Sequence, residues 1–256
     1  KGHLTALAVT ASSYSSGEHV TFYESAQAVQ PWVRSQRKAA RDRITHEHLL
    51  ASSAIPFVFP AKGITIDGHT EYFGDGSMRQ SAPIAAAIHL GAERVLVIGA
   101  GRMHEPRGDS TAPPSPSYPS LAQIAGHALS NIFLDALSVD VERVQRINQT
   151  LSLIPEEKRT HSALRPVELL VIAPSQRLDA IAARHVGDLP GPVRTMLGAL
   201  GVTSNMADVR GAALASYLLF EQGYTQELMA LGRADTLARR ADVCRFFGDR
   251  KSTRLN

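Results

Sequence analysis

The sequence predicts an α/β protein with a mainly parallel sheet that is covered by helices. Patterns typical of strands and helices alternate along the chain, in the order β-hairpin, helix, strand, helix, strand, long helix, strand and further helices. Two runs, Arg94–Ile98 and Val167–Ile172, are mostly apolar, which is typical of strands covered on both faces. No linker divides the 256 residues, so we expect one large domain over residues 1–248.

The first elements are predicted to form a hairpin followed by a helix. Leu4–Thr10 and His19–Tyr23 have the composition of strands, and the turn-like segment Ser12–Gly17 joins them, which indicates a hairpin near a sheet edge. Thr45 is then placed to cap a helix that runs through Leu50. A capping box needs Glu or Gln three residues later, and because His48 stands there we expect an incomplete cap.

The segment Ser52–Pro60, SSAIPFVFP, is predicted to end this helix. Pro56 and Pro60 bias the residues before them away from helical backbone angles. We expect Phe57 and Phe59 to pack inward. A second hairpin is expected over Ile64–Phe73, with the strong turn pair Asp67-Gly68 at its tip.

A strand-to-helix turn around Asp75 is the centre of the sequence. Asp75 lies in Gly74-Asp75-Gly76-Ser77, directly after the end of the second hairpin. Pro83 suits the first turn of the next helix, and Gly91 suits its end. With Arg94–Ile98 following, Asp75 is predicted to lie in a strand–helix–strand unit, where reactive groups gather at the carboxyl ends of strands.

The rest of the chain is predicted to be mostly helical. Leu121–Leu151 keeps near-helical apolar spacing, and packing on the sheet is a more common use of such a face than contact with lipid. After the strand Val167–Ile172, helices are expected over the following segments: Pro174–Ala183, part of Leu189–Gly201, Val209–Phe220, Thr225–Leu231 and Ala234–Phe247.

Charge and composition exclude several classes of protein. The last eight residues, Asp249–Asn256, resemble the translation of a sequencing-library adapter, and we expect them to be a non-native tail. Without its three basic and one acidic residues, 24 basic and 23 acidic residues remain, so the net charge falls from +3 to +1 and nucleic acid is not an expected partner. A single Cys fits a reducing compartment. No signal peptide or run of roughly 18 apolar residues is visible, so a cytoplasmic location or a peripheral place at a membrane is expected.

The segments on both sides of Asp75 resemble the patatin-like phospholipase family. The resemblance rests on SSAIPFVFP before Asp75 and APIAAAIHLGAERVLVIG after it, and it covers Leu4–Ile98 best. It implies a patatin-like three-layer architecture and a lipid acyl hydrolase in which Asp75 is the proton acceptor of a Ser–Asp dyad. Two positions differ from the family pattern. Ser77 replaces the Gly or Ala of the family motif, and Ala61 stands where a second Pro is frequent.

The serine of such a dyad is not found in the sequence. The family carries a glycine-rich oxyanion loop and a G-x-S-x-G elbow upstream of its Asp, and G-x-S-x-G does not occur here. Ser77 is no substitute, because Asp75 and Arg79 occupy the positions of the two elbow glycines. We therefore expect a chain that lacks the N-terminal part of the family domain and is inactive alone. Gly76 is expected to leave room for substrate, and Ser77 either to support the Asp75 carboxylate or to form a surface turn.

The resemblance implies an acyl-ester substrate, such as a phospholipid, and no cofactor. The ten histidines give no clear metal site, since His46 and His48 are two apart and His69 and His104 lie in a hairpin and a loop. Two further motifs are weak: Gly99-Ala100-Gly101 lacks the third glycine of a dinucleotide loop, and the glycosylation pattern Asn148-Gln149-Thr150 lies in a helix. Two residue groups suit either an acyl pocket or plain core: Phe57–Phe59 and Tyr217–Phe220. The alternative function is a non-catalytic scaffolding or regulatory module in which Asp75 only shapes a turn.

Overall fold

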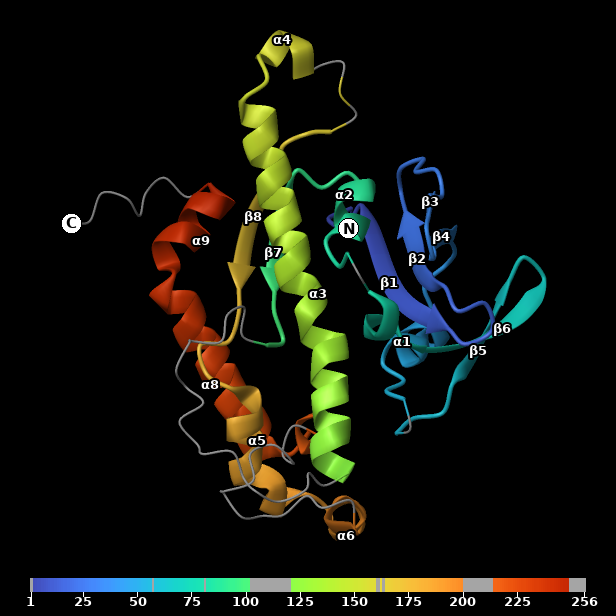
Figure 1. Ribbon diagram of the computed structural model, residues 1–256, viewed down its shortest axis with the longest axis vertical. Coiled ribbons are helices and arrows are strands. Elements are labelled where there is room, and N and C mark those ends of the chain that lie inside the picture. Colours follow the sequence, from blue (N-terminus) through green and yellow to red (C-terminus); the bar gives the residue numbers. More distant parts are fainter. Residues whose placement is uncertain are drawn as a thin grey trace. The chain divides into compact units, whose positions relative to one another are not determined.

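The computed structural model describes residues 2–56, 58–80, 82–101, 121–159, 162, 164–199 and 214–248. It divides into two compact units (Figure 1). The first unit comprises Lys1–Val95 and Val139–Val167, and the second comprises Leu96–Ser138 and Glu168–Asn256. The proposed non-native tail, Asp249–Asn256, lies outside the described residues.

The main sheet belongs to the first unit and is mostly antiparallel, so the prediction of a mainly parallel sheet is wrong. Its six strands lie in the order β3-β4-β2-β1-β6-β5 (Figure 1). Only β2 and β4 pair in parallel; the other four pairs are antiparallel. The strands are β1 (Ala6–Ser13), β2 (His19–Ser25), β3 (Val33–Arg34), β4 (Arg37–Arg41), β5 (Lys62–Ile66) and β6 (His69–Asp75).

Short connections explain the antiparallel pairing, because a parallel pair needs a crossover of a dozen or more residues. Both predicted hairpins are present, as β1–β2 and β5–β6. At the tip of the second, Asp67 and Gly68 have φ angles of 51° and 82°, which suit the two-residue turn predicted there. The first hairpin was expected near a sheet edge, but β1 and β2 lie inside the sheet and its edges are β3 and β5.

The strand that follows Asp75 in the sequence belongs to a different sheet. β7 (Arg94–Ile98) pairs with β8 (Glu168–Ile172) in a two-strand parallel sheet. The predicted strand–helix–strand unit around Asp75 is therefore wrong, since β6 and β7 do not share a sheet. The expectation that β7 is covered on both faces is also wrong, because the Ile98 side chain is 79% exposed.

Helix α1 packs on one face of the main sheet. It spans His46–Ser52, close to the prediction, and Ala51 joins Ala11, Val20, Phe22, Ile64 and Phe73 in a buried apolar cluster. On the other face Trp32 stacks between the rings of Tyr23 and His89, with centroid distances of 5.3 and 4.6 Å. His89 ends helix α2 (Ala85–His89), so α2 reaches the sheet face opposite to α1.

The segment between α1 and β5 differs in part from its prediction. α1 ends at Ser52, as expected from the two prolines that follow. Phe59 does not pack inward, because its side chain is 46% exposed. Phe57 lies outside the described residues. After α2, Gly91 has a φ of 100° and stops the helix, as its position predicted.

The long helix predicted over Leu121–Leu151 is present as α3 (Leu121–Ser152), followed by α4 (Glu156–Arg159). The Asn148 side chain donates to the Val167 carbonyl at 2.7 Å and accepts from the Val167 N–H at 3.0 Å. The Asn148 side chain therefore has a structural role, which agrees with the interpretation of the glycosylation pattern as a weak motif.

Helices form the core of the second unit. Its described helices are α5 (Leu178–His185), the 3₁₀ turn η2 (Val186–Asp188), α6 (Gly191–Ala199), α8 (Gln222–Ala238) and α9 (Arg240–Phe247). The buried apolar core includes Ile181, Leu197 and Leu231 from these helices and Leu219 from the segment before α8. The expected break between Leu231 and Ala234 is absent, because α8 runs through it. Leu219 belongs to this core, whereas Phe220 is 75% exposed.

Candidate functional site

Asp75 ends strand β6 at the point where the chain turns into a short 3₁₀ helix, η1 (Gly76–Arg79). It stands opposite Ala11 in the pairing of β6 with β1. Its backbone N–H donates to the carbonyl of Ala54 at 3.0 Å. This bond joins the SSAIPFVFP segment to the Gly-Asp-Gly-Ser turn, so the two segments are in direct contact. The expected place of Asp75, at the carboxyl end of a strand, is confirmed.

The Asp75 carboxyl group is buried and held by its neighbour Ser77. The residue is 8% exposed, and Oδ1 accepts a hydrogen bond from the Ser77 N–H at 2.8 Å. Burial raises the pKa of the Asp75 carboxyl above its usual value, while hydrogen bonds from the Ser77 backbone and hydroxyl oppose that rise. A carboxylate with a raised pKa is a stronger base than an exposed one, which suits proton abstraction. The same bond to Ser77 also caps the 3₁₀ turn, which suits the structural alternative.

The glycine that follows Asp75 is required by close packing. A Cβ atom on Gly76 would lie 2.4 Å from the Thr10 carbonyl oxygen, which is β1 backbone and cannot move aside. A Cβ atom on Gly74 would lie 2.3 Å from the Tyr14 hydroxyl, at the end of a side chain that is exposed enough to move. The space beside Gly76 is therefore filled by Thr10. The expectation that Gly76 leaves room for substrate is wrong.

A groove of about 780 Å³ begins next to this turn, between β1, α1 and α2. Thr10, Gln80 and Pro83 are among its lining residues, and Asp75 is not. The helix expected to start near Pro83 starts at Ala85, with Ile84 as its N-cap. Two lining residues, Gln80 and Pro83, follow Asp75 closely in the sequence. A third, Thr10, precedes Ala11, the residue that pairs with Asp75 across the two strands.

Two further polar side chains beside Asp75 were not anticipated from the sequence. Ser12 and His19 stand directly opposite each other in the β1–β2 pair, and they are 3% and 4% exposed. Neither Ser12 Oγ nor His19 Nδ1 has a hydrogen-bond partner among the described residues. Burial lowers the pKa of His19 to about 4, with contact to the Gly76 backbone opposing this and the charge of Arg37 adding to it.

Ser12, His19 and Asp75 do not form a Ser-His-Asp triad. Neighbouring residues of a strand point to opposite faces of the sheet, and directly paired residues point to the same face. Ser12 and His19 are paired with each other, whereas Asp75 is paired with Ala11. The register therefore places the serine and the histidine on one face and the carboxylate on the other.

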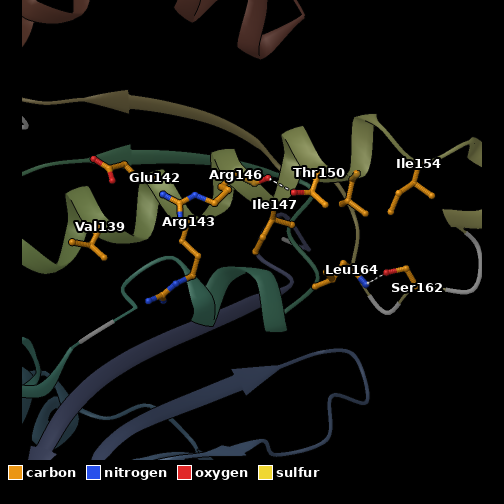
Figure 2. A pocket seen from close by; sticks show the side chains of 10 residues that line it. Val139, Glu142, Arg143, Arg146, Ile147, Thr150, Ile154, Ser162 and Leu164 are labelled. Carbon is orange, nitrogen blue, oxygen red and sulfur yellow. Dashed lines mark hydrogen bonds between the residues drawn. The ribbon is translucent and has the colours of Figure 1, made fainter.

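A second groove, of about 420 Å³, runs along the C-terminal half of α3 (Figure 2). Figure 2 shows Val139, Arg143, Arg146 and Ile147 on successive turns, with Leu164 from the segment after α4. Its hydroxyl groups serve the local backbone, since Thr150 donates to the Arg146 carbonyl at 3.0 Å and Ser162 accepts from the Leu164 N–H at 3.0 Å. The groove lining contains no paired nucleophile and base.

Asp140 lies next to this second groove on α3. It is 3% exposed, and it accepts hydrogen bonds from the Ile84 N–H at 3.0 Å and from Arg143 at 3.2 Å. Burial raises the pKa of the Asp140 carboxyl, and these two partners oppose that rise. Its oxygens therefore hold the start of α2 against α3, which is a structural role.

In its described part, the second unit contains a partly exposed ionic cluster that involves a histidine. His185 Nδ1 lies 2.8 Å from Asp188 Oδ2, and His185 Nε2 lies 2.8 Å from Glu227 Oε2. The other carboxylate oxygen of Glu227 pairs with Arg184. The carboxylates, first of Asp188 and then of Glu227, raise the pKa of His185. Both ring nitrogens are engaged, so the cluster links α5 and η2 to α8.

Over the described residues, no group of three or more His, Cys, Asp or Glu side chains is arranged to hold a metal ion. His104, one of the candidates, lies outside those residues. None of the helices in the described ranges combines the length and apolar character that crossing a bilayer requires.

No family model, no curated protein and no solved structure matches the chain.

Proposed function

We propose that this chain is part of a patatin-like serine acyl hydrolase whose substrate is a phospholipid or another acyl ester. Asp75 is the proton acceptor for a serine nucleophile carried on a segment outside this sequence. The observation that carries the proposal is the Asp75 carboxyl, which is buried at the carboxyl end of β6, has a raised pKa and is oriented by the Ser77 N–H. The Asp75–Ala54 backbone bond supports it further, because it holds Asp75 against SSAIPFVFP, one of the two segments that resemble the family.

The mechanism follows from what a dyad requires. The serine hydroxyl must come within roughly 2.6–3.2 Å of an Asp75 oxygen, so that the carboxylate takes its proton as the oxygen attacks the acyl carbonyl. The alkoxide-like tetrahedral intermediate needs backbone N–H donors, which the family places in a glycine-rich loop. Asp75 then gives the proton to the leaving alcohol, which leaves the acyl group on the serine. In the second step Asp75 takes a proton from the water that attacks this acyl-serine, and returns it to the serine oxygen as the free acid leaves. No cofactor takes part in these steps.

The alternative is a non-catalytic module in which Asp75 caps η1 and has no chemical role. It is favoured by the hydrogen bond from Ser77 to Asp75, because such a bond is common wherever Asp shapes a turn. The two functions make opposite predictions for replacement of the carboxylate by an amide, because Asn can still accept the Ser77 bond but cannot take a proton from serine.

The deciding experiment compares three proteins with p-nitrophenyl butyrate as the ester. The 256-residue chain alone is expected to give no turnover above buffer. The same chain extended upstream by its natural coding sequence is expected to contain G-x-S-x-G and to hydrolyse the ester. In the extended protein, Asp75→Asn is expected to lower kcat by about 10²–10⁴-fold, the usual contribution of general-base catalysis.

Circular dichroism of the extended Asp75→Asn variant establishes that it is folded, and Asp67→Asn, at the exposed tip of a hairpin, is the matched control. A folded Asp75→Asn variant that keeps most of its activity contradicts the proposal. An upstream sequence without the serine elbow contradicts it as well and favours the non-catalytic module.

A further inference from the structure

Strand β1 has one edge that is paired over only part of its length. Thr5 and Ser13 bond to β2, as shown by the bonds from the Ala26 N–H to the Thr5 carbonyl and from the Ser13 N–H to the Glu18 carbonyl, both at 2.9 Å. In an antiparallel pair such bonds recur at every second residue. The even-numbered residues, among them Ala6 and Ala8, therefore direct their N–H and C=O groups to the other edge.

That other edge is covered by β6 at one end alone. β6 pairs with β1 only from Ala11 to Ser13, and after Asp75 the chain turns away into η1. Ala6 and Ala8 consequently have no strand partner on this side among the described residues. Because β1 lies inside the sheet order, this is a gap within the sheet and not one of its outer edges.

The gap faces the groove of about 780 Å³ described above. From the helices, its lining includes Leu49 and Ser52 of α1 and Pro83, Ala86, Ala87 and Leu90 at α2. None of the residues that line it is charged. α1 packs on one face of the sheet and α2 reaches the other, so anything that extends the sheet here is covered on both faces.

The true outer edges of the sheet differ from this gap. β3 has only two residues, and β5 begins with Lys62, whose ammonium group lies 3.4 Å from the Glu47 carboxylate. Short strands and charged residues are the usual means of preventing unwanted strand addition at an edge. From Ala6 to Thr10, β1 carries no charge and no proline, so this part of its edge has no such protection.

The chemistry of the groove decides between two kinds of occupant. A hydrocarbon chain would suit the apolar lining but would leave the N–H and C=O groups of Ala6 and Ala8 buried without partners, which is unfavourable. An extended peptide satisfies these groups and also fills the apolar space. A strand covered on both faces is apolar on both faces, and the uncharged lining offers no partner for a charged side chain.

We propose that this groove is a docking site for an extended peptide strand, supplied by a partner protein and free of charged side chains, that pairs with Ala6 and Ala8 of β1. The open edge from Ala6 to Thr10 admits a strand of about five residues at 3.3 Å per residue. Main-chain hydrogen bonds give the binding its strength and the uncharged walls select the side chains. The proposal does not depend on the hydrolase function.

The test uses a display library of random decapeptides selected on the 256-residue chain. Enriched peptides are expected to lack charged residues over a run of about five positions. Ala8→Pro removes the N–H that points into the groove without removing a bond to β2, and it is expected to weaken binding by at least tenfold. Ala8→Ser keeps that N–H at similar size and is the matched control, which is expected to bind as the unchanged chain does.

Amide hydrogen exchange on the unchanged chain gives a readout that does not depend on how the proline variant folds. The bound peptide is expected to slow exchange at Ala6 and Ala8 at least tenfold and to leave Leu7 and Val9 unchanged. The proposal is overturned if no peptide is enriched, if binding leaves Ala6 and Ala8 unprotected, or if a folded Ala8→Pro variant binds equally well. It is also overturned if the groove instead takes a fluorescent acyl probe, or a second copy of the chain in a dimer that Ala8→Pro abolishes. Protection of Ala6 and Ala8 without added peptide, in the chain extended upstream by its natural coding sequence, would overturn it as well, because the chain itself would then fill the groove.

Discussion

Ionisation of the Asp75 carboxyl lowers the stability of the fold. Burial raises the pKa of this carboxyl by more than the hydrogen bonds from Ser77 lower it. A carboxyl whose pKa is raised in the folded state contributes stability below its unfolded pKa, and that contribution is lost as the pH rises through the folded value. At neutral pH the charge on Asp75 therefore destabilises the folded chain. Such a cost is common where a side chain serves chemistry.

Asp75→Asn is accordingly expected to leave the free energy of unfolding at pH 7 unchanged or to increase it. The amide oxygen can still accept the Ser77 N–H, and no charge is buried. The advantage of the variant is expected to shrink as the pH falls toward the ordinary pKa of Asp, where the native carboxyl becomes protonated. Urea unfolding at pH 7 and pH 4 measures this. A variant that is clearly less stable at pH 7 would show that the carboxylate itself holds the turn together.

Gly76 lies against the β1 backbone, and this gives a second prediction at the residue scale. Gly76→Ala places a methyl group 2.4 Å from the Thr10 carbonyl oxygen, which is backbone and cannot rotate away. We expect a loss of about 1–3 kcal/mol in the free energy of unfolding, the usual cost of forcing extra atoms into a packed site.

Gly232→Ala in α8 is the matched control, because a Cβ there meets nothing within 4 Å. It is expected to raise stability by about 0.5–1 kcal/mol, since Gly is unfavourable in a helix interior. Thermal unfolding of both variants checks the pair. Equal stability of Gly76→Ala and the unchanged chain would mean that the Thr10 contact is looser than described.

At the scale of single elements, local sequence signals were reliable. The turn pair Asp67-Gly68, the stop at Gly91 and the long α3 helix were predicted because each depends on the backbone preferences of a few consecutive residues. The Thr45 cap was underestimated, since His48 Nδ1 accepts the Thr45 N–H at 3.2 Å and takes the part of the Glu or Gln. A rule written for carboxylates and amides does not anticipate an imidazole with the same reach.

His185 and its two carboxylates add an ionic contact between α8 and the elements α5 and η2. A histidine whose pKa is raised contributes stability that is fully present below its unfolded pKa and is lost as the pH rises through the folded value. The pKa of Glu227 is lowered, chiefly by His185, so its contribution is lost as the pH falls through that value. The cluster is therefore most effective in mildly acidic solution.

His185→Gln is expected to lower the free energy of unfolding at pH 6 by up to about 1 kcal/mol, the upper range for partly exposed ion pairs. The loss is expected to be smaller at pH 9, because native His185 loses its charge as the pH rises. His3→Gln, at an exposed position, is the control. Thermal unfolding at the two pH values gives the comparison, and an equal loss at both would assign the effect to packing against Tyr224 instead of charge.

At the scale of the whole molecule, the sequence predicted an α/β composition but not the sheet. Strand pairing joins residues far apart in the chain, and no local pattern states that β6 adds to β1 while β7 pairs with β8. The candidate site shows the same division. The place of Asp75 at a strand end was predictable from its neighbours, whereas Ser12 and His19 were missed because their burial results from pairing across β1 and β2.

The histidines His19 and His185 are expected to affect the stability of their two units in opposite directions as the pH changes, because their pKa values are shifted in opposite directions. In the first unit His19 has a pKa of about 4, so it is neutral when folded and binds a proton on unfolding below about pH 6.5. Proton binding by His19 in the unfolded state therefore lowers the free energy of unfolding as the pH falls from 6.5 to 4, by roughly 3 kcal/mol in total. In the second unit the raised pKa of His185 removes stability as the pH rises.

Hydrogen exchange, corrected for its intrinsic pH dependence, tests this on the unchanged chain. From pH 7 to pH 5, protection of the first-unit core at Val20 and Phe22 is expected to fall, while protection at Ile181 and Leu231 in the second unit is expected to hold. His19→Gln cannot be protonated, so it is expected to abolish the decline in the first unit and leave the second unchanged. A parallel decline of both cores in both proteins would mean that the buried His19 is not the group that titrates.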